Sequence, residues 1–74
     1  MTSKTHQIGQ FIRAARKEQG LTQVELASLA QVGPRFIGEL EKGKQTLAIE
    51  KVLQVLDALG IEFTIAPRNW NTDG

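Results

Sequence analysis

Apolar residues recur at helical spacing in four stretches of the sequence, which predicts four helices. The first covers about residues 5–19, and the second covers residues 23–30. The third begins at Pro34 and ends at Gly43, and the fourth covers about residues 47–59. The buried stripes predicted for the first three helices are Ile8, Phe11, Ile12 and Ala15, then Leu26, Ala27 and Ala30, then Ile37 and Leu40.

The second and third helices are separated by a short turn and form the centre of the prediction. The spacing Thr22-x-x-Glu25 is a capping box, in which each side chain bonds the other residue's backbone N–H. Pro34 suits the first turn of the next helix, because its missing N–H would have no partner there. Two short helices joined by residues 31–33 are the plan of a helix-turn-helix, which offers its second helix to the DNA major groove. A small helical hairpin with an apolar interior is the alternative.

Three short motifs favour the helix-turn-helix over the hairpin. They are Thr22-Gln23-x-x-Leu26-Ala27, Ile37-x-x-Leu40-Glu41-x-Gly43-Lys44, and the helix end Ala58-Leu59-Gly60. Over residues 8–60 they together resemble the phage-repressor family, also described as Cro-type or xenobiotic-response-element proteins. The resemblance implies that Arg16 pairs with Glu41 and locks the first helix to the end of the third. It also implies that Gln23 contacts a phosphate or a base edge.

The resemblance places the DNA contacts on the third helix and on the loop that follows it. Arg35 is the leading candidate for reading a base, because arginine pairs bidentately with guanine O6 and N7. The loop supplies phosphate contacts, which position a protein without specifying sequence. The predicted DNA-binding residues are Gln23, Gly33, Pro34, Arg35, Phe36, Glu39, Lys42, Lys44, Gln45 and Thr46.

Four positions in this region leave alternatives open. Gln31 stands where the family usually has glycine, so the turn either costs about 1 kcal/mol or differs in shape. Phe36 either lies against a thymine methyl group or covers the edge of the core. Gly38 gives clearance either for DNA or for a neighbouring helix. Glu39 either accepts a hydrogen bond from cytosine N4 or holds Arg35 at i,i+4 spacing, and the second is favoured.

The fourth helix and the residues after it predict a dimer. Residues 47–59, with Thr46 as N-cap, carry more apolar side chains than one buried face needs, so a second face is expected to meet a partner. Residues 61–65 alternate apolar and polar side chains, the pattern of a β-strand. A lone strand has no internal partner, so we expect it to pair with the same strand of a second copy. The residues expected at this interface are Val55, Leu59, Ile61, Phe63 and Ile65.

This ending differs from that of ordinary phage repressors, which tend to have a further helix. A strand in its place resembles the HipB-type antitoxins, the DNA-binding partners of HipA-type kinase toxins. Residues 67–74 would form a flexible tail after a helix-turn-helix and dimerisation domain of residues 1–66. Trp70, the single tryptophan, either anchors a kinase toxin or belongs to a solvated end.

Composition and charge narrow the function classes. The 74 residues contain no cysteine and one histidine, which argues against disulfides, a metal cluster, a cofactor and an enzyme. The longest apolar runs fall short of the roughly 20 residues that a membrane span needs, so we expect a cytoplasmic protein. The net charge is only +1, but residues 1–24 balance to +3 and residues 47–74 to −2. A basic end is expected if it faces phosphates, although a mixed solvated surface is the alternative.

The sequence therefore predicts an all-α, four-helix repressor-type helix-turn-helix domain followed by one C-terminal β-strand that pairs with its copy in a second subunit. We expect a non-enzymatic transcriptional repressor that binds a palindromic operator as a homodimer and acts as the antitoxin of a HipA-like kinase toxin. A stand-alone repressor is the alternative within this class. A protein-interaction module is the alternative from another class, and nonspecific DNA binding with a steep salt dependence would separate the two.

Overall fold

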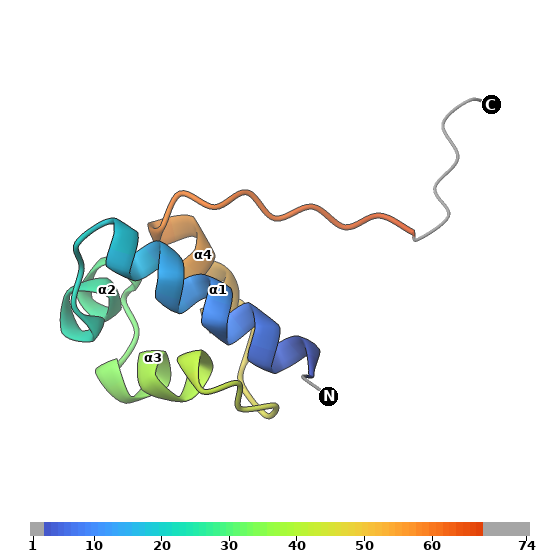
Figure 1. Ribbon diagram of the computed structural model, residues 1–74, viewed down its shortest axis with the longest axis horizontal. Coiled ribbons are helices and arrows are strands. Elements are labelled where there is room, and N and C mark those ends of the chain that lie inside the picture. The colour runs from blue at the N-terminus through green and yellow to red at the C-terminus, as the bar shows by residue number, and fades with distance from the viewer. Residues whose placement is uncertain (1–2, 68–74) are drawn as a thin grey trace.

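The structure, a computed structural model, describes residues 3–67, which contain four helices (Figure 1). They are α1 (Lys4–Glu18), α2 (Gln23–Ala30), α3 (Pro34–Glu41) and α4 (Ile49–Ala58). The predicted bounds of α2 and the predicted start of α3 are confirmed. Both capping-box hydrogen bonds are present, from Glu25 N–H to Thr22 Oγ1 at 3.0 Å and from Thr22 N–H to Glu25 Oε1 at 2.8 Å.

The core lies where the four helices meet, and each helix contributes one fully buried aliphatic side chain to it. These side chains are Ile12, Leu26, Ile37 and Val55. Ala27 is also buried, and its small side chain lets α2 approach its neighbours closely. Burying an aliphatic side chain of this size stabilises a fold by about 1.5–3 kcal/mol. Because the four side chains come from four different helices, their burial favours the packing of all the helices against one another.

All four helices are followed by a residue with positive φ. This residue is glycine after three of them and glutamine after α2. Gly20, Gly43 and Gly60 have φ values of 73°, 87° and 74° at the ends of α1, α3 and α4. At the end of α2, Gln31 adopts the same left-handed conformation with φ 61° and ψ 42°. The turn between α2 and α3 therefore keeps its tight shape, and Gln31 bears a strain of about 1 kcal/mol that glycine would avoid.

The buried stripe predicted for α1 is partly wrong. Ile12 is buried and Ala15 is half-buried, but Ile8 and Phe11 have 43% and 56% of their surface exposed. The reason is that the buried face of α1 is formed by Gly9, Ile12 and Arg16, and Gly9 lies against α3. A Cβ atom on Gly9 would lie 2.3 Å from the carbonyl oxygen of Leu40, so the two backbones are nearly in contact.

Helix α4 begins later than predicted, and Thr46 is not its N-cap. Ala48 occupies the cap position and makes no side-chain cap hydrogen bond. Leu47 belongs to the loop between α3 and α4, where its side chain is half-buried against the core. Helix α4 starts only after this residue. None of the helices described here is long and apolar enough to cross a membrane.

All but one of the residues assigned to the dimer interface divide into two groups. Val55 and Leu59 are buried in the core of a single chain, with 0% and 5% exposure, so assigning them to the interface is wrong. Ile61 is half-buried against the core and belongs to neither group. Residues 61–67 form no strand within the described chain, and the segment that follows Ile61 leads away from the helices (Figure 1). Phe63 and Ile65 are exposed there, and their pairing with a second copy stays a prediction. The tail interpretation centred on Trp70 lies outside the described residues.

Candidate nucleic-acid interface

Most predicted DNA-binding residues gather on the outer side of α3 and on the loop that follows it. Arg35 lies in the first turn of α3, and 91% of its side chain is exposed. Gly33 has open space where a Cβ atom would be, so a ligand can approach the start of the helix closely. The other exposed members of the set are Gln23, Pro34, Lys42, Lys44, Gln45 and Thr46.

A buried carboxylate at the end of α3 fixes this surface to the other helices. Arg16 of α1 donates to Glu41 through Nε at 2.6 Å and through Nη2 at 3.1 Å, so the ion pair implied by the family resemblance is present. Gln23, the first residue of α2, donates its Nε2 to Glu41 Oε1 at 3.1 Å. Arg16 also donates to the carbonyl oxygen of Leu21 at 2.8 Å. One carboxylate thus joins α1, α2 and α3.

The protonation states of this pair follow from its surroundings. Burial raises the pKa of Glu41, but the hydrogen bonds from Arg16 and Gln23, together with the positive charges of Arg16 and Arg13, bring the pKa below its ordinary value. The hydrogen bond to Glu41 raises the pKa of Arg16. Both groups are therefore charged at neutral pH. Removing either partner would leave a buried charge uncompensated, at a cost of about 3–5 kcal/mol.

A second, half-buried carboxylate, that of Glu39, lies on the outer side of α3 and contacts two predicted DNA-binding cations. Arg35 Nε is 3.5 Å from Glu39 Oε2, and Lys44 Nζ is 3.2 Å from the same oxygen. The hydrogen bond from Lys44 is the largest contribution that lowers the pKa of Glu39. Of the two alternatives for Glu39, the contact with Arg35 at i,i+4 spacing is therefore the one present in the protein without DNA.

Phe36 lies at the edge of the core. Its ring is half-buried and packs against the core side chains. The ammonium group of Lys51 in α4 lies 5.9 Å from the ring centroid, within reach of a cation–π interaction. The structure thus favours the core-edge interpretation of Phe36 over a thymine contact.

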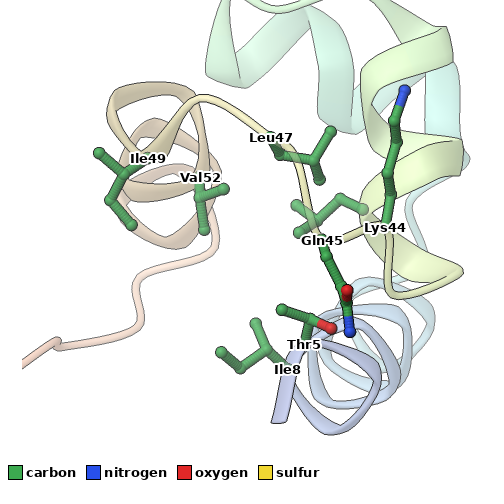
Figure 2. A pocket seen from close by; sticks show the side chains of 8 residues that line it. Thr5, Ile8, Lys44, Gln45, Leu47, Ile49 and Val52 are labelled. Atoms are coloured by element: carbon green, nitrogen blue, oxygen red, sulfur yellow. The ribbon is translucent and has the colours of Figure 1, made fainter. Parts of the chain in front are cut away.

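The loop of residues 42–48 points its polar side chains in different directions. Figure 2 shows Lys44 extending away from a small pocket between α1 and α4, toward α3, while Gln45 lies near Thr5. The pocket has a volume of about 160 Å³ and is mainly aliphatic, with Ile49 and Val52 on its far side. Lys44 is therefore better placed than Gln45 to meet a phosphate beside α3.

Two features of this surface were not predicted from the sequence. Gly9 allows α1 to lie against the carbonyl groups of Leu40 and Glu41, which positions the end of α3. Arg13 has 57% of its side chain exposed and its Nε lies 4.0 Å from Glu41 Oε1, so it adds positive charge beside Gln23. Arg13 is one helical turn from Arg16, and this spacing is the signal that could have identified it.

The sequence profile of the helix-turn-helix family matches residues 12–65, which span all of the surface just described except the start of α1. The chain belongs to this family, in its Cro-type branch. As a member it is a DNA-binding domain of the transcription-regulator class.

Similar proteins agree with this assignment. The chain is 57% identical over 58 residues to an uncharacterized helix-turn-helix transcriptional regulator, y4mF, of Sinorhizobium fredii, covering 78% of this chain and 76% of that protein. It also resembles the crystal structure of the restriction-modification controller protein C.AhdI from Aeromonas hydrophila. That likeness has a TM-score of 0.74 and 30% identity, over 82% of this chain and 92% of the other.

The HipB fold is similar as well. In the structure titled as the HipA-HipB-O2-O3 complex, one chain matches with a TM-score of 0.80, over 93% of this chain and 97% of that chain. The sequence identity is 19%, so this likeness concerns the fold alone.

Proposed function

We propose that this protein is a sequence-specific transcriptional repressor that binds a pseudo-palindromic operator as a homodimer. The observation that carries the proposal is the position of Arg35. It is almost fully exposed in the first turn of α3, the part of a helix-turn-helix that enters the major groove. Lys42 and Lys44 follow directly after the helix, are both exposed and would supply electrostatic contacts to the DNA backbone.

The homodimer is supported by an apolar surface on the described chain. Ile8 and Phe11 of α1 and Ile49 and Leu53 of α4 are exposed and line one groove of about 330 Å³. Phe63 of the extended segment lies at the edge of the same groove. A surface that carries both an apolar groove and a projecting apolar segment is self-complementary, which suits a twofold interface.

Two substitutions test the proposed DNA surface. Arg35→Ala should weaken operator binding by about 1–3 kcal/mol and leave nonspecific binding nearly unchanged, because it removes a base contact. Lys44→Ala should weaken both and reduce the salt slope of binding by about one unit, because it removes a phosphate contact. Affinities would be measured by fluorescence anisotropy, with an operator selected by the wild-type protein from random duplexes and with a duplex of scrambled sequence.

Sequence discrimination is the decisive quantity in this test. If the Arg35→Ala variant still separates the selected operator from the scrambled duplex as well as wild type does, the docking of α3 proposed here is wrong. If the wild-type protein shows no salt-dependent DNA binding, the proposed function itself is wrong.

A second candidate is the role of antitoxin to a HipA-like kinase toxin. It is supported by the alternating apolar pattern of residues 61–65 and by the direction of this segment. Figure 1 shows α3 on one side of the helical body and residues 61–67 leaving from the opposite side. A partner bound to the C-terminal end would therefore leave the proposed DNA surface accessible.

Truncation would test the antitoxin role separately from DNA binding. A chain ending at residue 66 should keep its operator affinity and lose its affinity for a kinase toxin encoded next to its gene, and Trp70→Ala should lose part of that affinity. Both affinities would be measured by surface plasmon resonance. Unchanged toxin binding by the truncated chain would refute the role of the tail, and a genome without an adjacent kinase gene would favour the stand-alone repressor.

A further inference from the structure

The polar cluster on the outer side of α3 has an arrangement that a simple cationic surface would lack. A carboxylate, Glu39, lies between the predicted base-reading side chain and the predicted phosphate-binding side chain. Its Oε2 atom is 3.5 Å from Arg35 Nε and 3.2 Å from Lys44 Nζ. Negative charge in this position opposes DNA binding, so its presence calls for a function that outweighs this cost.

Lys44 is joined to Glu39 by one backbone hydrogen bond and by one contact to the carboxylate. The backbone N–H of Lys44 donates to the carbonyl oxygen of Glu39 at 3.1 Å, while the Lys44 ammonium group bonds the Glu39 side chain. Only 29% of the Glu39 side chain is exposed, against 91% for Arg35. Glu39 is thus the more buried member of the pair and Arg35 the more exposed one.

We infer that Glu39 is a specificity-determining residue, which keeps Arg35 away from the phosphates of arbitrary DNA until a guanine replaces the carboxylate as its partner. The inference rests on the proposed function. On any duplex, Lys44 can leave Glu39 for a phosphate because the ammonium group contacts the backbone as a point charge. Arg35 then has Glu39 to itself, and the bidentate contact with guanine O6 and N7 is the interaction that replaces this carboxylate at the operator.

The consequence is a larger ratio between operator and nonspecific affinity. An arginine held by a carboxylate contributes no counterion release on nonspecific DNA, whereas a released arginine neutralises about one phosphate. Glu39→Gln removes the charge and keeps nearly the same size and shape. For each chain that contacts the duplex, we therefore expect this variant to bind scrambled DNA more tightly by about five- to tenfold near 0.1 M salt, with a salt slope steeper by about 0.9. Operator affinity should change less, so discrimination should fall.

A matched control separates this effect from the simple loss of one negative charge. Asp57 is an exposed acidic residue near the C-terminal end of α4, and it makes no salt bridge in the described part of the chain. Asp57→Asn changes the net charge by the same amount as Glu39→Gln. Its salt slope on scrambled duplex should match that of wild type. Thermal melts of both variants would check that each is folded before binding is compared.

The route through Arg35 is tested by a double-mutant cycle on the full chain. In an Arg35→Ala background, Glu39→Gln should no longer steepen the salt slope on scrambled duplex, because no arginine remains to be released. A slope that steepens equally in both backgrounds would overturn the inference, since Glu39 would then act only as a repelling charge. Equal slopes for the Glu39→Gln and Asp57→Asn variants would also overturn it. If wild type shows no salt-dependent DNA binding, the proposed function is wrong as well as the inference. A failure of the inference alone is therefore distinguishable from a failure of the proposed function.

Discussion

At the scale of single residues, the Glu41 carboxylate is the group on which the geometry of the DNA surface depends. It accepts hydrogen bonds from Arg16 of α1 and from Gln23 of α2, although it lies at the end of α3. Each buried side-chain nitrogen and oxygen atom in residues 3–67 has a hydrogen-bond partner, so this polar cluster is fully satisfied. A satisfied network of this kind fixes the helices relative to one another.

Removing the arginine from this pair should destabilise the protein severely. We expect Arg16→Met to lower the free energy of unfolding by about 3–5 kcal/mol at neutral pH, because Glu41 stays buried without its counterion. Arg13→Met is the matched control, since Arg13 is largely exposed and lies 4.0 Å from the same carboxylate. Urea unfolding followed by circular dichroism would measure both. A loss for Arg16→Met no larger than that for Arg13→Met would show that the pair contributes little.

The same carboxylate predicts a dependence of stability on pH. Its pKa in the folded protein lies below the ordinary value of 4.5, so the charged form favours folding. This contribution is complete above the unfolded pKa and is lost as the pH falls through the lower folded pKa. Between about pH 5 and pH 3, the free energy of unfolding should therefore fall more steeply for wild type than for Glu41→Gln. Parallel curves from urea titrations at several pH values would contradict this assignment.

Much of the candidate site could be predicted because it depends on local sequence signals. The capping box at Thr22 and the proline at position 34 mark helix starts by hydrogen bonding and fixed φ, which need no tertiary information. The pairing of Arg16 with Glu41 came from the family resemblance rather than from periodicity. The contact between Gln23 and Glu41 could not be predicted, since it depends on how closely α2 meets the end of α3.

At the scale of elements, the errors share a physical cause. Periodicity shows that a helix has an apolar face, but not which neighbour covers it. Ile8 and Phe11 fit the helical spacing of a buried stripe, yet α1 meets α3 through Gly9, whose missing side chain gives no apolar signal. Leu47 likewise looks like the first turn of α4, although it packs against the core from the preceding loop.

The glycine within α3 provides a prediction at this scale. A Cβ atom on Gly38 would lie 3.8 Å from Gln23 Oε1, an ordinary contact, so α2 does not require glycine there. Gly38→Ala should therefore stabilise the free protein by about 1 kcal/mol through helix propensity. We expect Gly38→Ala also to weaken operator binding, because the space left by the missing side chain would then be needed for the close approach of DNA. Thermal unfolding and anisotropy titrations would measure the two effects.

A second glycine serves as the comparison for this experiment. Gly9→Ala should destabilise the protein, since its Cβ atom would lie 2.3 Å from the Leu40 carbonyl oxygen and the backbones of α1 and α3 would have to separate. If Gly38→Ala raises stability without any loss of operator affinity, then the glycine does not provide clearance for DNA.

At the scale of the whole molecule, the chain presents its two proposed functions on different sides. The exposed side of α3 faces one way, and residues 61–67 leave the body on the other (Figure 1). A twofold pair of such chains would present two α3 helices to one face of DNA. Recognition helices that enter successive major grooves lie about 34–36 Å apart, so the operator should contain two half-sites related by that spacing or a multiple of it.

A substitution in the apolar segment of residues 61–67 should therefore prevent dimerisation and lower operator affinity together. Phe63 has 53% of its surface exposed and lies outside the buried core, so Phe63→Lys should leave the single chain folded. We expect this variant to sediment as a monomer at micromolar concentration, where wild type sediments as a dimer. Operator affinity should fall by about 10²–10⁴-fold, because two linked half-site contacts become one.

Leu29→Lys is the control for this last prediction. Leu29 is 60% exposed, but it lies on α2 beside Gln31 and Asp57, away from the groove that Phe63 borders. Both variants add one positive charge and remove one exposed apolar side chain, so a difference between them reflects the position of the substitution and not the change in charge. Analytical ultracentrifugation and operator titrations on the same samples would compare them. If Phe63→Lys stays dimeric, or if it becomes monomeric and keeps full operator affinity, then the extended segment does not join the two halves of the repressor.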